Sequence, residues 1–230
     1  MNIGGFQEIS LLDYPGKVAT IIWTTGCNFR CPFCYNPDMV LDTTDHVPVE
    51  DFYAFLRQRT GKIDAVSISG GEPLLQKDIS DFITHIKDLG FLVKIDTNGS
   101  FPTKLEGLID KDLVDYVSMD VKSSKKNYAE ITKISIDIDD IDQSIQLIKN
   151  KAADYEFKTT VIPTYHREED IIEIAKWIKG AKRYYLQQFK SDIALLSSET
   201  ASVKPYPIQV LKQMCEKASS YVDQCSVRGG

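Results

Sequence analysis

The sequence is poor in histidine, has no long apolar run and carries no excess of positive charge. Only 3 of its 230 residues are histidine, and 33 acidic residues outnumber 27 basic ones, for a formal net charge of −6. Proteins that bind nucleic acid usually carry a basic surface, and a membrane-spanning helix needs about 20 apolar residues. The first residues, Met1 to Gly5, also lack the basic and apolar pattern of a signal peptide. We therefore expect a cytoplasmic protein that binds neither nucleic acid nor membrane.

The cysteines are few and unevenly placed. There are 5, an odd number, and most fall in one short motif, which argues against a disulfide framework. Cys215 falls at helical spacing among apolar residues and is predicted to be a core thiol. Cys27, Cys31 and Cys34 share the spacing C-x3-C-x2-C and are the candidate chemical site.

This cysteine loop, residues 24–40, follows an apolar run at 18–23 that reads as a buried strand. Grouped thiolates suit a soft metal centre, either zinc or an iron–sulfur cluster. A structural zinc site is normally closed by four ligands, and no fourth Cys or His is appropriately placed nearby. Three thiolates on a four-iron cluster would leave one iron open to a ligand that is not protein. We favour the open cluster.

Strands and helices alternate along the rest of the chain. Six strands are predicted at 18–23, 63–69, 91–96, 114–121, 155–162 and 183–189, with an edge strand at 5–12 and a short strand at 221–227. Helices are predicted near 49–59, 77–89, 103–110, 141–152, 171–178 and 207–219, whereas 123–137 shows no clear pattern. Such alternation predicts a parallel sheet with right-handed crossovers. We expect a single domain over 1–230, ending in a helix and short strand at about 205–230.

Polar and glycine residues gather where successive strands end. These are the cysteine loop, Gly70-Gly71-Glu72, Asp96 to Gly99, Asp120 with Lys122, and Gln187 with Gln188. In a β/α barrel these ends meet on one face, where ligands bind. Six units are too few for a closed eight-stranded barrel. The sequence therefore predicts an α/β fold, a partial (β/α)6 barrel open at its side.

The cysteine spacing, with Phe33 directly before the third cysteine, resembles the signature of the radical S-adenosylmethionine (SAM) superfamily. Within it, the order of the motifs resembles the activating enzymes of glycyl-radical enzymes. The likeness is closest to the activating protein of anaerobic ribonucleoside-triphosphate reductase. It is carried by 13–16 (Asp-Tyr-Pro-Gly), the cysteine loop, 69–73, 96–99, 119–122, 159–163 and 186–189.

The resemblance implies a role for each matching residue. Cys27, Cys31 and Cys34 would ligate a 4Fe–4S cluster whose open iron is chelated by SAM. The resemblance places Phe33 near the adenine of SAM and Asp120 near its ribose. It places Gly70, Gly71 and Glu72 along the methionine end, where they receive the amino group, and Lys122 at the methionine carboxylate. The other implied cofactor-binding residues are Asp96, Asn98 and Gln187. In the pyruvate formate-lyase activating enzyme, the segments equivalent to 96–97 and 118–120 also hold a monovalent cation. By this resemblance, the same segments of this chain would also hold a monovalent cation.

The sequence departs from the family pattern at Lys190, and its histidines match no ligand position of the family. A relative has a ribose-contacting histidine where this sequence has Lys190, so Gln187 or Gln188 would take that contact. None of His46, His85 and His166 stands where a ligand is needed. We expect all three histidines at solvated surface positions.

The implied activity is that of an anaerobic oxidoreductase. An external one-electron donor such as flavodoxin or ferredoxin would reduce the cluster, SAM would be cleaved reductively, and a hydrogen atom would be taken from a glycine of the partner glycyl-radical enzyme. One alternative keeps the cofactors but acts on a small molecule, as 7-carboxy-7-deazaguanine synthase does. Another is a non-catalytic metal-binding module, which predicts bound zinc without iron or sulfide.

Overall fold

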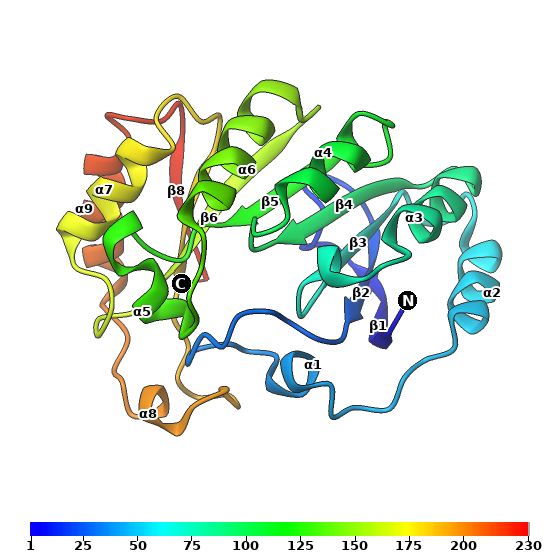
Figure 1. The fold of residues 1–230 in the computed structure, drawn as a ribbon, viewed down its shortest axis with the longest axis horizontal. Coiled ribbons are helices and arrows are strands. Elements are labelled where there is room, and N and C mark those ends of the chain that lie inside the picture. The colour runs from blue at the N-terminus through cyan, green and yellow to red at the C-terminus, as the bar shows by residue number, and fades with distance from the viewer. Residues whose placement is uncertain (230) are drawn as a thin grey trace.

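One curved, eight-stranded sheet organises the chain (Figure 1). The computed structural model describes residues 1–229. The strands follow one another in sequence order, and only the β1–β2 pair is antiparallel. Their bounds are β1 Ile3–Ser10, β2 Ala19–Thr24, β3 Ala65–Gly70, β4 Leu92–Thr97, β5 Tyr116–Asp120, β6 Tyr155–Val161, β7 Tyr184–Gln188 and β8 Cys225–Arg228. The first and last strands are edges, so the barrel stays open, as predicted.

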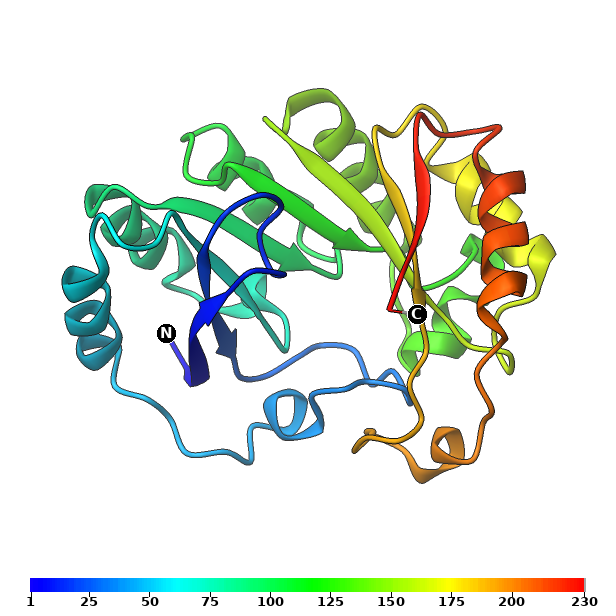
Figure 2. The same cartoon turned by 180° about the vertical axis from the view of Figure 1, so that it is seen from behind.

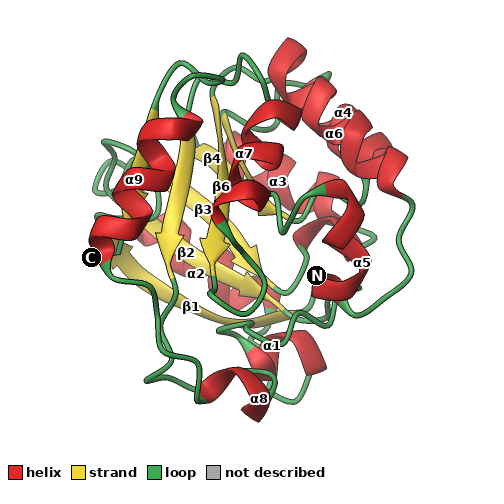
Figure 3. Cartoon of the chain, turned by 90° about the vertical axis from the view of Figure 1, so that its left-hand side faces the viewer, coloured by secondary structure: helices red, strands yellow, loops and turns green. Residues whose placement is uncertain are grey.

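Helices cover the outer, convex face of this sheet (Figures 1 and 3). The main ones are α2 Val49–Arg59, α3 Ile79–Asp88, α4 Pro102–Ile109, α6 Ile138–Lys151, α7 Glu168–Trp177 and α9 Ile208–Ala218. Shorter ones are α1 Pro37–Leu41, α5 Tyr128–Thr132, α8 Ser198–Ala201 and the 3₁₀ turns η1 Pro73–Leu75 and η2 Lys125–Asn127. Each main helix buries an apolar stripe against the strands; in α3 it is Ile79, Phe82, Ile83 and Ile86. No described helix is long and apolar enough to cross a membrane.

The inner, concave face of the sheet is polar. Alternate residues of β4, β5 and β6 point to opposite faces, so the apolar residues pack outward beneath the helices. The polar set on the other face includes Ser67, Lys94, Asp96, Ser118, Asp120, Glu156 and Lys158. Parallel strands covered on both faces are normally apolar throughout. A polar inner face therefore marks the interior of the barrel as a binding site rather than a second core.

The sheet's two edges lie on the same side of the molecule. Seen from behind, β1 and β8 both face the viewer, at opposite ends of the curved sheet (Figure 2). The strand β8 begins at Cys225, later than the predicted 221, because residues 219–224 first turn away from α9. Cys215 is buried on α9, as predicted.

Candidate active site

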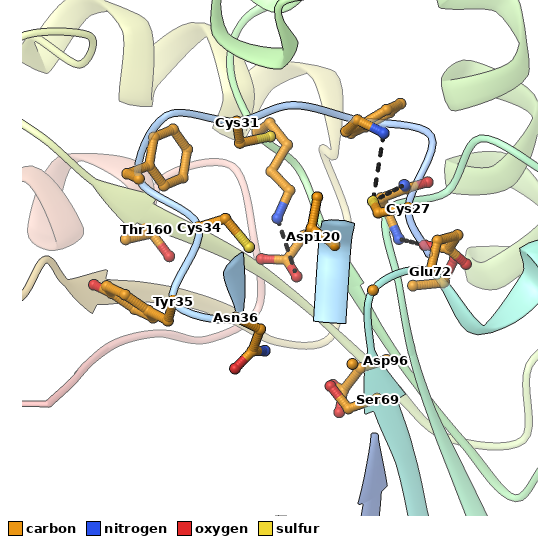
Figure 4. A pocket seen from close by; sticks show the side chains of 18 of the residues that line it. Cys27, Cys31, Cys34, Tyr35, Asn36, Ser69, Glu72, Asp96, Asp120 and Thr160 are labelled. Carbon is orange, nitrogen blue, oxygen red and sulfur yellow. Dashed lines mark hydrogen bonds and ion pairs between the residues drawn. The ribbon is translucent and has the colours of Figure 1, made fainter. Parts of the chain in front are cut away.

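A cavity of about 170 Å³ lies where the parallel strands end. It gathers every residue that the sequence nominated for cluster and cofactor. These are Cys27, Cys31, Phe33, Cys34, Gly70, Gly71, Glu72, Asp96, Asn98, Asp120, Lys122 and Gln187 (Figure 4). Their convergence is a property of the fold, since the segments are far apart in sequence; the role of each residue stays a prediction.

The cysteine loop is held in place by a backbone hydrogen bond between its own two ends and by others to two distant segments. The amide of Gly26 donates to Met39 O of α1 at 2.7 Å, and that of Arg30 to Thr132 O of α5 at 2.9 Å. On its other side, the amides of residues 196 and 197 donate to Cys34 O and Pro32 O at 3.1 and 2.9 Å. The short helices that the sequence did not reveal thus flank and fix the loop that carries the thiols.

The three thiols are neutral in the free chain. Burial raises the pKa of Cys27 to about 11 and that of Cys31 to about 12, and it also raises the pKa of Cys34. A metal centre must therefore displace their protons. Among residues 1–229, no group of three or more His, Cys, Asp or Glu side chains could hold a single metal ion. Three loop thiols around a pocket, without a fourth ligand, fit a cluster larger than one zinc ion.

Gly70 and Gly71 let the end of β3 approach the start of the cysteine loop. A Cβ on Gly70, where φ is +116°, would lie 2.3 Å from Thr24 N, and one on Gly71 would lie 2.0 Å from Gly26 O. The amides of Gly71 and Glu72 donate to Thr24 O and Gly26 O, both at 2.8 Å. The sequence suggested glycine for close approach to a ligand. The contact that requires it is with the protein's own backbone.

Replacing Gly71 with Ala is therefore expected to displace the cysteine loop. Because the new Cβ would collide with Gly26 O, we expect the free energy of unfolding to fall by about 1–3 kcal/mol and the iron content after reconstitution to fall with it. Thermal unfolding and iron analysis measure the two effects. Gly107→Ala is the matched control, since that helical position opens to free space and should gain about 0.5–1 kcal/mol. Equal iron in both variants would contradict this role for Gly71.

Glu72 is an acid with no exposed surface. Its Oε1 accepts from Leu74 N at 3.0 Å and Thr97 Oγ1 at 2.8 Å, and its Oε2 accepts from Asn98 N at 2.7 Å. Burial raises the pKa of Glu72 to about 7, although these hydrogen bonds favour the charged form. Two carboxylate oxygens can accept about four hydrogen bonds, so one position stays available to a ligand.

Asn98 braces the end of β4 against the cysteine loop. Its Nδ2 donates to Asn28 Oδ1 at 2.9 Å and lies 3.9 Å from Cys27 Sγ. Asn28 Nδ2 in turn donates to Ser100 Oγ at 2.9 Å. The resemblance assigns Asn98 to the cofactor. The contacts show that it also orients the first thiol of the motif.

Asp96, Asp120 and Lys122 belong to one row of ion pairs on the inner face. Lys122 Nζ lies 3.4 Å from Asp120 Oδ2, and Asp96 is bound by Lys94 Nζ through both carboxylate oxygens at 2.8 Å. Burial alone would lower the pKa of Lys122, but Asp120 raises it, and so do the nearby thiols once they ionise. Lys122 therefore stays charged beside the cysteines.

Aromatic side chains and one amide complete the wall. Phe33 is buried with its ring centroid 6.2 Å from that of Tyr165, and Tyr35 stacks on Phe189. Gln187 lines the cavity, whereas Gln188 Nε2 donates to Tyr206 O at 2.7 Å outside it. Of the two glutamines that could replace the relative's histidine, the structure turns Gln187 to the pocket.

Several lining residues were missed by the sequence analysis, among them Tyr35, Asn36, Ser69, Lys158 and Thr160. Two of them follow from β6, where Glu156, Lys158 and Thr160 alternate with Tyr155, Phe157 and Thr159. This alternation is visible in the sequence, and it predicts that every second side chain of the strand points to the polar inner face. Residues chosen only at strand ends could not include those within a strand.

His166 is buried, so the prediction of three solvated histidines was wrong. Its Nδ1 accepts from Ile162 N at 3.2 Å and its Nε2 lies 2.8 Å from Lys122 O, which fixes the neutral ring with the proton on Nε2. Burial lowers the pKa of His166. His85 is half-buried against Tyr53, and only His46 is exposed. The sequence places His166 in a loop and does not show these partners, because the ring joins Ile162, just after β6, to Lys122, the second residue after β5.

The open barrel and its loop of three thiols define a class, the enzymes that cleave SAM at an iron–sulfur cluster. Residues 21–178 match the family model of the Radical SAM superfamily. A Methanocaldococcus jannaschii protein, named a candidate glycyl-radical enzyme activating enzyme, is 36% identical over 98% of this chain and 95% of its own. The chain belongs to the radical SAM superfamily, among the glycyl-radical enzyme activating enzymes.

Two further similarities bear on the fold and the family. The pyruvate formate-lyase-activating enzyme of Listeria monocytogenes is 28% identical over 77% of this chain and 76% of its own length. SuiB of Streptococcus suis, crystallised with its precursor peptide SuiA, superposes with a TM-score of 0.71 at 18% identity, over 91% of this chain and 48% of its own. The chain thus spans about half the length of SuiB. As a radical SAM oxidoreductase, it uses a 4Fe–4S cluster and SAM.

Proposed function

We propose that this enzyme installs a glycyl radical on a partner protein, the anaerobic ribonucleoside-triphosphate reductase. The observation that carries the proposal is the relative named as an activating enzyme, which is similar over nearly the whole of both chains. The choice of this reductase among glycyl-radical enzymes rests on the sequence motifs at 13–16, 96–99 and 119–122.

A second cavity supports a protein substrate. It measures about 270 Å³ and shares Ser69, Asp96, Lys158 and Gln187 with the first cavity, so the two adjoin. Its other wall includes Leu12, Asp13 and Pro15 of the β1–β2 turn and Arg228 of β8. An opening between the two edge strands suits an extended peptide that carries its glycine toward the cofactor. Leu12 is 93% exposed beside it, as a docking residue would be.

The chain's own residues have positioning roles in this reaction. When bound, the reduced cluster supplies the electron for reductive cleavage of SAM, which yields the species that removes hydrogen from a glycine Cα. Cys27, Cys31 and Cys34 would hold the cluster, Glu72 would accept from the amino group of SAM, and Lys122 would donate to its carboxylate. The pocket walls exclude water and hold the reacting carbon against the glycine. Hydrogen abstraction needs no side-chain acid or base.

The electron is proposed to come from outside, from a carrier such as flavodoxin or ferredoxin. Cys215 and Cys225 are the only cysteines beyond the loop. Within 1–229 neither belongs to a group of ligating side chains that could hold a metal. The chain therefore offers no relay centre of its own in the part described.

Incubation with the reductase tests the activase proposal. Reconstituted, reduced protein with SAM and the reductase is expected to give a glycyl-radical signal in electron paramagnetic resonance (EPR) and equivalent 5′-deoxyadenosine. A reductase variant with its radical-bearing glycine replaced by alanine is the control and should give neither the signal nor coupled turnover. Reductive cleavage of SAM without any protein radical would instead favour the small-molecule alternative.

A further inference from the structure

Lys158 holds a central place among the charges of the pocket. It lies on β6 directly opposite Asp120 of β5, in register. Its Nζ is 3.1 Å from Asp96 Oδ1 and 3.6 Å from Asp120 Oδ2. One ammonium group therefore bridges the carboxylates of two neighbouring strands, and it lines both cavities.

Each of the two carboxylates has a second lysine as well. Lys94 binds both oxygens of Asp96, and Lys122 lies 3.4 Å from Asp120. Although burial alone would disfavour ionised groups here, the pKa of Asp96 is lowered by Lys158 and Lys94, and that of Lys158 is raised by Asp120 and Asp96. Three ammonium groups thus meet two carboxylates, and the third carboxylate nearby, Glu156, is paired through both oxygens with the Arg228 guanidinium, so positive charge is in excess at this point of the pocket.

These charges do not fit the monovalent cation that the family resemblance implied. That ion would take its ligands from 96–97 and 118–120, and the two carboxylates of these segments, Asp96 and Asp120, already face lysine. It would also sit beside three ammonium groups in a partly buried site, where like charges repel strongly. The carboxylates that would bind the ion are therefore already paired with lysine ammonium groups of the protein itself.

We propose that Lys158 is the resident cation of the cofactor pocket and that this chain binds SAM without sodium or potassium. One Lys158 N–H group donates to Asp96 Oδ1, and the ammonium forms a longer ion pair with Asp120, so an N–H group is free to donate to an oxygen of the bound cofactor. Lys158 is thus a positioning residue. The assignment rests on SAM being the ligand of this pocket, but not on the identity of the protein partner.

The test compares salts of equal ionic strength on cluster-reconstituted protein. Wild-type protein is titrated with SAM in potassium chloride, sodium chloride and tetramethylammonium chloride; tetramethylammonium screens charge but cannot enter a two-carboxylate site. We expect SAM affinity and 5′-deoxyadenosine formation to agree within about twofold in all three salts. We also expect no saturable broadening of the ²³Na resonance by the wild-type protein.

Lys158→Met removes the charge while keeping most of the side chain's length. In tetramethylammonium chloride, SAM should bind about tenfold more weakly or worse, because a charge-assisted contact is lost. Potassium or sodium should restore most of the affinity, and saturable ²³Na broadening should appear. Lys62→Met, at an exposed turn, is the charge-matched control and should behave as wild type in every salt.

Three results would overturn the proposal. They are a wild-type affinity that drops when sodium and potassium are withdrawn, a Lys158→Met variant that binds SAM normally in tetramethylammonium chloride, and a folded variant that no salt restores. If Lys158→Met does not fold, the wild-type salt comparison alone decides. The salt titrations contain no partner protein. Failure to form a glycyl radical on the reductase would therefore refute the proposed function without affecting this inference.

Discussion

Replacing Cys31 with Ala is expected to abolish reductive cleavage of SAM, with a loss of more than about 100-fold in 5′-deoxyadenosine formation. Cys31 is the most buried of the three loop thiols, and its loss would leave two of the three ligands proposed for the cluster. Iron and sulfide per chain after anaerobic reconstitution should fall to less than about half of the wild-type content. Both quantities are measured on the same preparation.

Cys225→Ala is the matched control for that experiment. Cys225 is half-buried on β8, away from the loop, so its replacement should leave iron, sulfide and SAM cleavage at wild-type levels. Unaltered cleavage in the Cys31→Ala variant would show that the thiol is not a ligand. Equal losses in the two variants would point to a general loss of folding instead.

Replacing Glu72 with Gln is expected to weaken SAM binding by about 10- to 100-fold, because the contact proposed between its buried carboxylate and the amino group of SAM would be lost. The wild-type protein should also bind SAM more weakly as pH falls through 7, where Glu72 takes up a proton. The Glu72→Gln variant cannot titrate, so its affinity should lack this dependence. Glu216→Gln, at an exposed position of α9, controls for the loss of a negative charge. A pH profile shared by wild type and Glu72→Gln would exclude Glu72 as the titrating group.

The same residue has the opposite effect on stability. Folding raises the pKa of Glu72 from its ordinary value of 4.5 to about 7, so between these values the folded chain binds a proton that the unfolded chain does not. Stability from this group therefore falls as pH rises. Relative to Glu72→Gln, the wild-type free energy of unfolding should decrease by about 2 kcal/mol from about pH 5.5 to about pH 8.5. Denaturant unfolding of the cluster-free chain at several pH values measures the difference. An increase would contradict the assigned shift.

The fold could be predicted from the sequence because its periodicities are strong. The apolar stripe of α3 and the alternation of strands with helices determine a parallel sheet, and six units leave it open. The helices α1, α5 and α8 span five, five and four residues, too few to show a helical period. Moreover, Lys133, the residue that follows α5, has φ of +56°, a left-handed position that glycine usually occupies at the end of a helix.

The site could be predicted where residues follow strand ends, and not where they lie within strands. The cysteine loop and Glu72 stand out as motifs, whereas Lys94 and Lys158 read as ordinary charged residues of half-exposed strands. Only the register of β4, β5 and β6 shows that their ammonium groups meet Asp96 and Asp120. The burial of His166 could not be predicted either, because its hydrogen-bond partners, Ile162 N and Lys122 O, come together only in the folded chain.

EPR spectroscopy can show whether the protein carries an iron–sulfur cluster with one iron open to SAM. Anaerobically reconstituted protein is reduced and its spectrum is recorded before and after addition of SAM. The expected result is a four-iron signal that changes when SAM is added, followed by release of 5′-deoxyadenosine. A signal indifferent to SAM, or protein that retains zinc and takes up neither iron nor sulfide, would contradict the claim.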